Sequence, residues 1–166
     1  MKKITLAFIL LISLTLTTYA QKMVVIDVDY ILENMATYQK AQKQLDEVAA
    51  TWRTEISAEH DKIKGLYNKY QAEQVLLSDE MRKQREDEIV NREKEVMSLQ
   101  KRKFGPEGEL FKKRQELVQP IQEKVYGVIE EYATQRGYDM VFDNNGTLIY
   151  VDPEHDKTDE IVRRLK

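Results

Sequence analysis

A long stretch without helix breakers, residues 33–77, constrains the fold of this chain more than any other feature. It contains no proline and a single glycine, Gly65. Apolar residues recur in it at coiled-coil intervals, with a shift of four residues near Trp52 that locally unwinds a supercoil. The pattern predicts one helix of about 44 residues, which would extend roughly 65 Å. The two sets of apolar residues are Tyr38, Ala41, Leu45, Val48 and Trp52, then Ala49, Ile56, Ile63 and Tyr70.

A second helix is predicted to return along the first. Ser78 or Asp79 can cap its start, which places the tip of the resulting hairpin near residues 76–80. Fifteen of the 26 residues from 78 to 103 are charged. A helix this polar has only a narrow stripe to bury, so it can pack along one partner helix while its other faces stay in water.

The returning helix is interrupted at residues 104–108, which include Gly105, Pro106 and Gly108. Proline lacks an amide donor and glycine loosens the backbone, so a break is expected here. The break is either a hinge of the arm or a fixed kink. Heptad spacing then resumes and predicts helix as far as Gly137, a suitable C-cap; the apolar residues of this stretch are Phe111, Val118, Val125 and Tyr132.

Short β-strands are predicted at both ends of this helical arm. Residues 23–28 are rich in β-branched side chains, and residues 138–142 and 147–151 flank Asn145-Gly146, a strong hairpin signal. A short helix follows, capped by Thr158 or Asp159. The fold class is therefore α+β and mostly α: a long antiparallel helical hairpin, residues 33–136, on a small β body formed by residues 21–32 and 137–166.

Three short strands bury little surface and small sheets are only marginally stable, so assembly of several copies of the chain is the simplest way to stabilise the body. The strand-bearing ends would form the shared base, and the arms would project from it. The residues expected in the assembled body are Val24, Ile26, Val28, Val141, Leu148 and Tyr150.

The first twenty residues have the layout of a secretory signal peptide. Lys2 and Lys3 precede an apolar run at residues 4–16, and Thr18 and Ala20 put small side chains at the usual cleavage positions. The apolar run is short for a membrane span. We expect export to the periplasm and cleavage after Ala20, so that the mature chain begins at Gln21; an N-terminal membrane anchor is the alternative.

Composition argues against several other classes of protein. The chain has no cysteine, which excludes disulfides and a lipoprotein anchor. Removing Lys2 and Lys3 with the signal peptide lowers the formal net charge from −3 to −5, and a net-acidic chain is poorly suited to nucleic acid. His60 and His155 do not have metal-ligand spacing, and no nucleophile motif is present. We therefore expect neither an enzyme nor a protein that binds a cofactor or metal.

The order of these elements behind a signal peptide resembles the Skp/OmpH family of periplasmic chaperones. The likeness is carried by residues 24–32 (VVIDVDYIL), 138–143 (YDMVFD) and 158–162 (TDEIV), while the arms match in length and character. The resemblance implies a homotrimer in which three helical tentacles project from a β-rich body around a cavity. It also implies an ATP-independent holdase for unfolded outer-membrane β-barrel proteins in transit through the periplasm.

This chain departs from the best-known members of that family, which are basic. Its net negative charge puts in question any peripheral contact with a membrane or with lipopolysaccharide. Two local basic runs can still attract anionic partners: Lys101-Arg102-Lys103 and Lys112-Lys113-Arg114.

Candidate contacts with client proteins lie on the arm. They are Leu76 and Leu77 at the expected tip, with Trp52, Tyr67 and Tyr70 along the first helix. Trp52 and Tyr70 can equally fill the seam between the two helices. The alternative function is a structural coiled-coil spacer of the cell envelope, which would favour unbroken heptads and rigid arms.

Overall fold

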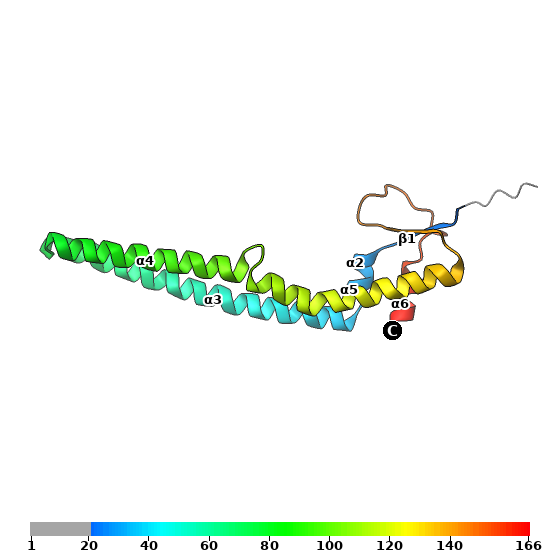
Figure 1. The fold of residues 1–166 in the computed structure, drawn as a ribbon, viewed down its shortest axis with the longest axis horizontal. Coiled ribbons are helices and arrows are strands. Elements are labelled where there is room, and N and C mark those ends of the chain that lie inside the picture. Colours follow the sequence, from blue (N-terminus) through cyan, green and yellow to red (C-terminus); the bar gives the residue numbers. More distant parts are fainter. Residues whose placement is uncertain (1–20) are drawn as a thin grey trace, which may run out of the picture.

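The computed structural model describes residues 21–166 and shows an elongated molecule, in which a long helical hairpin projects from a small body (Figure 1). The expected signal peptide and its cleavage site lie outside the described residues. The mostly helical α+β class and the long helical hairpin are confirmed. The elements are β1 (Met23–Ile26), α2 (Val28–Glu33), α3 (Ala36–Glu73), the 3-10 helix η1 (Gln74–Leu76), α4 (Asp79–Phe104), α5 (Glu109–Arg136), β2 (Met140–Asp143) and α6 (Thr158–Leu165).

Strand β1 holds the body together because it is bonded along both edges. On one edge it runs parallel to β2, with Met23 opposite Met140. On the other edge the Val25 N–H donates to the His155 carbonyl, and the Val25 carbonyl accepts from the Lys157 N–H, both at 2.9 Å. One four-residue strand therefore joins the beginning of the described chain to two segments near its end.

The hairpin predicted around Asn145-Gly146 does not form. Strand β2 ends at Asp143, and residues 147–151 run as an open loop. The two-residue turn that Asn-Gly favours needs positive φ at both central residues. Gly146 has φ +85°, but no non-glycine residue in the described part of the chain has a positive φ, so Asn145 does not supply the second one. The sheet of residues 21–166 consequently has two parallel strands instead of the three predicted.

Strand β1 is also shorter than predicted, because the expected strand continued to Val28. Asp27 ends it: its Oδ1 accepts the Tyr30 N–H at 2.8 Å and caps α2. Val28 thereby becomes the first residue of α2, and α3 begins only at Ala36. The short helix α2 adds apolar side chains to the body core, which consists of Ile26, Val28, Ile31, Leu32, Val125, Ile129, Tyr132 and Ile161.

The arm has one continuous side and one interrupted side. Helix α3 forms the continuous side, and α4 followed by the first part of α5 packs against it. Its buried residues form two separate clusters rather than one seam. The shift of heptad register near Trp52 in α3 lies at the level of the break between α4 and α5, since the Trp52 and Phe104 rings are in contact. The proximal cluster is Ala41, Leu45 and Val118, and the distal cluster is Ile56, Ile63, Ile89 and Val96.

The break between α4 and α5 is a tight excursion of the backbone. The Gly105 N–H donates to the Lys101 carbonyl, and the Gly108 N–H donates to the Gly105 carbonyl, both at 2.8 Å. A Cβ on Gly108 would lie 2.8 Å from the Arg102 carbonyl oxygen and 2.9 Å from that of Lys103. Such distances are too short for a contact between a Cβ atom and a backbone carbonyl oxygen, so this loop requires glycine at position 108.

Gly137 ends α5 and turns the chain toward β2, which confirms the predicted C-cap. Its φ of +67° lies in the left-handed region that favours glycine. The Tyr138 N–H donates to the Ala133 carbonyl at 3.0 Å and satisfies an acceptor of the last turn. Helix α6 then closes the body, and Lys157 occupies its N-cap position instead of Thr158 or Asp159. None of the described helices is both long and apolar enough to span a membrane.

Replacing Gly108 by alanine should lower the free energy of unfolding by about 1–3 kcal/mol, because the added Cβ cannot fit unless the backbone moves. Replacing Gly65 by alanine should raise it by about 0.5–1 kcal/mol, because Gly65 lies within α3 and has open space around it. Urea unfolding of both variants at equal protein concentration measures the two changes. Equal changes in the free energy of unfolding at the two positions would contradict the tight packing around Gly108.

Candidate functional site

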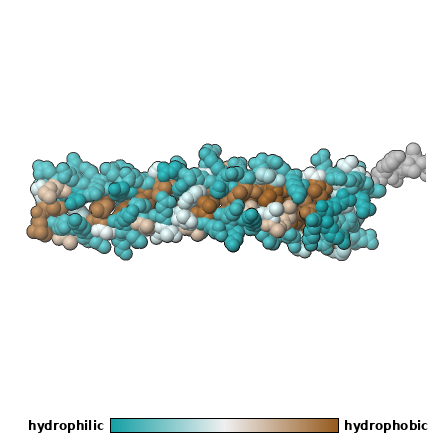
Figure 2. Space-filling model, turned by 90° about the horizontal axis from the view of Figure 1, so that it is seen from below, coloured by the Kyte–Doolittle hydropathy of each residue, from teal (hydrophilic) through white to brown (hydrophobic). Residues whose placement is uncertain are grey.

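The tip of the arm exposes a small apolar group. Leu77 adopts an extended backbone after η1, and Ser78 caps α4 by accepting the Met81 N–H on its Oγ at 3.3 Å. Because no other described element covers this turn, Val75 and Leu76 are 80% and 84% exposed, while Leu77 is half-buried. Figure 2 shows apolar atoms gathered at this end of the molecule. The tip therefore presents a hydrophobic surface far from the body.

Two tyrosines below the tip have different surroundings. Tyr67 is 50% exposed. Tyr70 packs against the distal cluster, and its hydroxyl donates to Glu86 on α4. This hydrogen bond raises the pKa of Tyr70 above its ordinary value, so the hydroxyl stays protonated and able to donate. Tyr67 is available to a partner, whereas Tyr70 ties the two helices of the arm together.

Trp52 fills the space beside the break in the arm. Its ring meets Phe104 edge-on with the ring centroids 6.1 Å apart. The Lys103 Nζ lies 4.4 Å from the Trp52 centroid, and the Arg53 guanidinium lies 5.9 Å from that of Phe104. These contacts join the end of α4 to the middle of α3. Trp52 thus belongs mainly to the seam between the helices.

The basic run before the break is partly neutralised. Lys101, Arg102 and Lys103 occupy the last turn of α4, where positive charge interacts favourably with the helix C-terminus. Arg102 and Lys103 both pair with Glu109, the first residue of α5. Less free positive charge surrounds the break than the sequence alone indicates.

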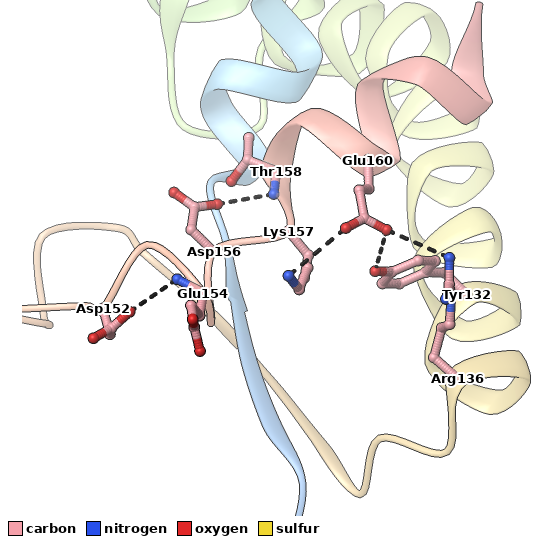
Figure 3. A network of polar contacts seen from close by, with 8 residues as sticks. All are labelled: Tyr132, Arg136, Asp152, Glu154, Asp156, Lys157, Thr158 and Glu160. Carbon is pink, nitrogen blue, oxygen red and sulfur yellow. Dashed lines mark hydrogen bonds and ion pairs between the residues drawn. The ribbon is translucent and has the colours of Figure 1, made fainter.

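A polar network fastens α6 to α5 within the body (Figure 3). The Tyr132 hydroxyl donates to the Glu160 carboxylate at 2.6 Å, and Lys157 and Arg136 lie 3.7 and 3.8 Å from that carboxylate. The hydrogen bond from Tyr132 and the nearby cations hold the pKa of Glu160 below its usual range. Burial, together with the same hydrogen bond, raises the pKa of Tyr132. A neutral phenol and an ionised carboxylate are therefore the stable pair at neutral pH.

The loop between β2 and α6 exposes a second apolar group. Leu148, Ile149 and Tyr150 are 36%, 105% and 79% exposed. In Figure 1 this loop stands away from the helices of the body. An apolar run this exposed, next to a small sheet, is a candidate surface for contact with another chain.

The six residues assigned to the body from the sequence fall into two groups. Val24, Ile26 and Val28 are buried within the single chain, and Val141 packs against the same body core. The other two, Leu148 and Tyr150, lie in the exposed loop.

Sequence reasoning missed Val75, Ile149 and Glu160. Val75 and Ile149 each adjoin a residue that was singled out, so their apolar character was a usable signal. Glu160 gives no such signal, because its partner Tyr132 lies on a different helix. Across residues 21–166 no group of three or more histidine, aspartate and glutamate side chains is arranged to hold a metal ion.

Comparison with family models identifies the family of this chain. Residues 22–165 match the family model described as outer membrane protein (OmpH-like). The chain also resembles the crystal structure of a protein from Caulobacter crescentus CB15, described as a candidate outer membrane chaperone (OmpH-like). The TM-score is 0.69 over 89% of this chain and 85% of the other, at 10% sequence identity, so the likeness concerns the fold. No curated protein matches the chain.

Replacing Glu160 by glutamine should lower the free energy of unfolding by about 1 kcal/mol at neutral pH, because the hydrogen bond from Tyr132 loses its charged acceptor. A carboxyl whose pKa is lower in the folded state than in the unfolded state stabilises the protein at pH values above its unfolded-state pKa. This stabilisation is lost as the pH falls through the folded-state pKa. The difference between variant and wild type should therefore shrink once the pH drops below the ordinary value of 4.5. Urea unfolding at neutral and acidic pH measures it.

Glu154→Gln is the matched control, because Glu154 is an exposed residue of the preceding loop. It should leave the stability unchanged at both pH values. A Glu160→Gln difference that stays constant with pH would contradict the network.

Proposed function

Since the chain belongs to the OmpH-like outer membrane protein family, we propose that it is an exported chaperone that holds unfolded outer-membrane β-barrel proteins without ATP. The observation that carries this proposal is the exposed apolar tip at Val75 and Leu76, set at the end of a long arm. An unfolded barrel protein exposes apolar side chains at alternate positions and unpaired strand edges. Several weakly binding arms can hold such a chain by multivalency, without one tight pocket.

Assembly as a homotrimer would give the arms a common base. Two features support it: the exposed apolar loop at Leu148, Ile149 and Tyr150, and β2, which is an edge strand in the described part of the chain. In our proposal residues 147–151 of one copy lie along β2 of the next. A head-to-tail contact of this kind closes into a ring when the rotation between copies fits, and closure leaves no free edge.

The break at Gly105, Pro106 and Gly108 is proposed as the hinge of the arm. The separate packing clusters on either side of it support this proposal, because a tilt of the distal part would require α3 to bend at this level but would leave both clusters intact. The basic runs around the same break are where a membrane surface or lipopolysaccharide would make peripheral contact. The cavity between three arms would enclose the client in the periplasm.

A structural spacer of the cell envelope is the second candidate. Two observations favour a stiff arm: the uninterrupted helix α3 and the Tyr70–Glu86 hydrogen bond that ties it to α4. Cross-linking in cells separates the two functions, because a spacer would be joined to one fixed partner and a chaperone to many unfolded proteins.

Light scattering during dilution of a urea-unfolded β-barrel protein tests the proposed function. The purified mature protein should suppress aggregation without ATP when about one trimer is present for each client. A stable trimer that leaves aggregation unchanged would support the spacer instead.

Replacing Val75 and Leu76 together by serine should weaken the suppression of aggregation by about tenfold, which corresponds to losing about 1.4 kcal/mol of apolar burial per client. Both side chains are largely exposed, so thermal stability should not change. Met97→Ser is the control, because Met97 is 67% exposed on the middle of the arm. An equal loss of activity in the control would show that the tip has no special role.

Replacing Ile149 by aspartate should shift the solution mass from trimer to monomer, because a charge at the centre of the exposed loop cannot be buried between copies. The chain should remain helical, since Ile149 makes little contact within its own chain. Leu76→Asp carries the same charge at the opposite end of the molecule and should leave the mass unchanged. Size-exclusion chromatography with light scattering measures both variants; a trimeric Ile149→Asp protein would exclude the loop from the interface.

A further inference from the structure

Only Gln21 and Lys22 precede strand β1 in the described part of the chain. Strand β1 begins at Met23, and the preceding residue, Lys22, is already held by Asp139, the residue before β2. The Lys22 N–H donates to the Asp139 carboxylate at 2.8 Å, and the Lys22 carbonyl accepts the Asp139 N–H at 2.9 Å. Gln21 lies immediately outside this clamp and is exposed.

This inference rests on the proposed export and on the cleavage after Ala20 that the sequence predicts, which would make Gln21 the N-terminal residue. A glutamine in that position carries an amine and a carboxamide on the same residue, spaced to close a five-membered ring. The amine nitrogen bonds to the side-chain carbonyl carbon, the bond from that carbon to the amide nitrogen breaks, and ammonia leaves. The product is a lactam, pyroglutamate, and no oxidant, metal or cofactor is consumed.

We infer that Gln21 of the mature chain is modified to pyroglutamate. An α-amino group has an ordinary pKa of about 7.7, so a part of it is unprotonated and nucleophilic at neutral pH. The exposure of Gln21 leaves its side chain free to bend back and open to a cyclising enzyme. The N–H that Lys22 donates to Asp139 is retained in the product, so ring closure costs no hydrogen bond of the clamp.

The ring protects the strand on which the body depends. An aminopeptidase that removed Gln21 and Lys22 would eliminate the hydrogen bonds between Lys22 and Asp139 and expose the first residue of β1. A lactam has no free amine, and an aminopeptidase requires one.

The test is the intact mass of the protein exported by its native host, together with N-terminal sequencing before and after treatment with pyroglutamyl peptidase. The expected mass is that of residues 21–166 minus one ammonia, with sequencing blocked until the peptidase is added. A Gln21→Ala chain, cut at the same place, should show its full mass and sequence directly. It should also lose its first two residues faster than wild type when both are incubated with an aminopeptidase.

A chain cut after Ala20 that retains a free amine would overturn the inference and leave the proposed export intact. A chain cut elsewhere, or not cut, would overturn both this inference and the predicted cleavage site. Suppression of aggregation is measured separately on the Gln21→Ala protein and should equal wild type, so a failure of the modification is distinguishable from a failure of the chaperone function.

Discussion

Strand β1 holds the body together, because it is hydrogen-bonded to β2 along one edge and to residues 155–157 along the other. Residues separated by more than a hundred positions meet at this strand, as in the hydrogen bonds from Lys22 to Asp139 and from Asp27 to Thr158. Closing so long a loop would be costly for a flexible chain. Here the intervening segment is itself an antiparallel helical hairpin, which returns the chain to its starting point. The arm therefore helps to form the body, and the body in turn fixes the base of the arm.

The small amount of packing within the chain explains why apolar side chains remain exposed at both ends of the molecule. Two helices lying side by side bury only a narrow stripe, which here consists of two small clusters flanking the Trp52–Phe104 contact. Nothing in the described chain covers Leu76 at the tip or Ile149 in the loop of the body. Both groups are therefore candidate surfaces for contact with other chains. In the proposed function one end binds clients and the other binds further copies of the chain.

Local signals made much of this fold predictable from sequence. Heptad spacing identified the helices, Ser78 was one of the two N-cap candidates, Gly137 was found as a C-cap, and the glycines around Pro106 marked the break. The strands were harder, because their pairing is decided by contacts remote in sequence. Asn145-Gly146 predicted a hairpin, but β2 pairs with β1 instead, and Asn145 does not adopt the positive φ that the turn needs. The Tyr132–Glu160 bond was not foreseen for the same reason, since only the folded body brings α5 and α6 together.

Native mass spectrometry of the mature protein, alone and after dilution of an unfolded β-barrel protein into it without ATP, tests both the proposed assembly and the proposed client binding. We expect three copies of the chain in the free state and three copies with one client in the mixed sample. A folded monomer, or a trimer that never retains a client, would contradict it.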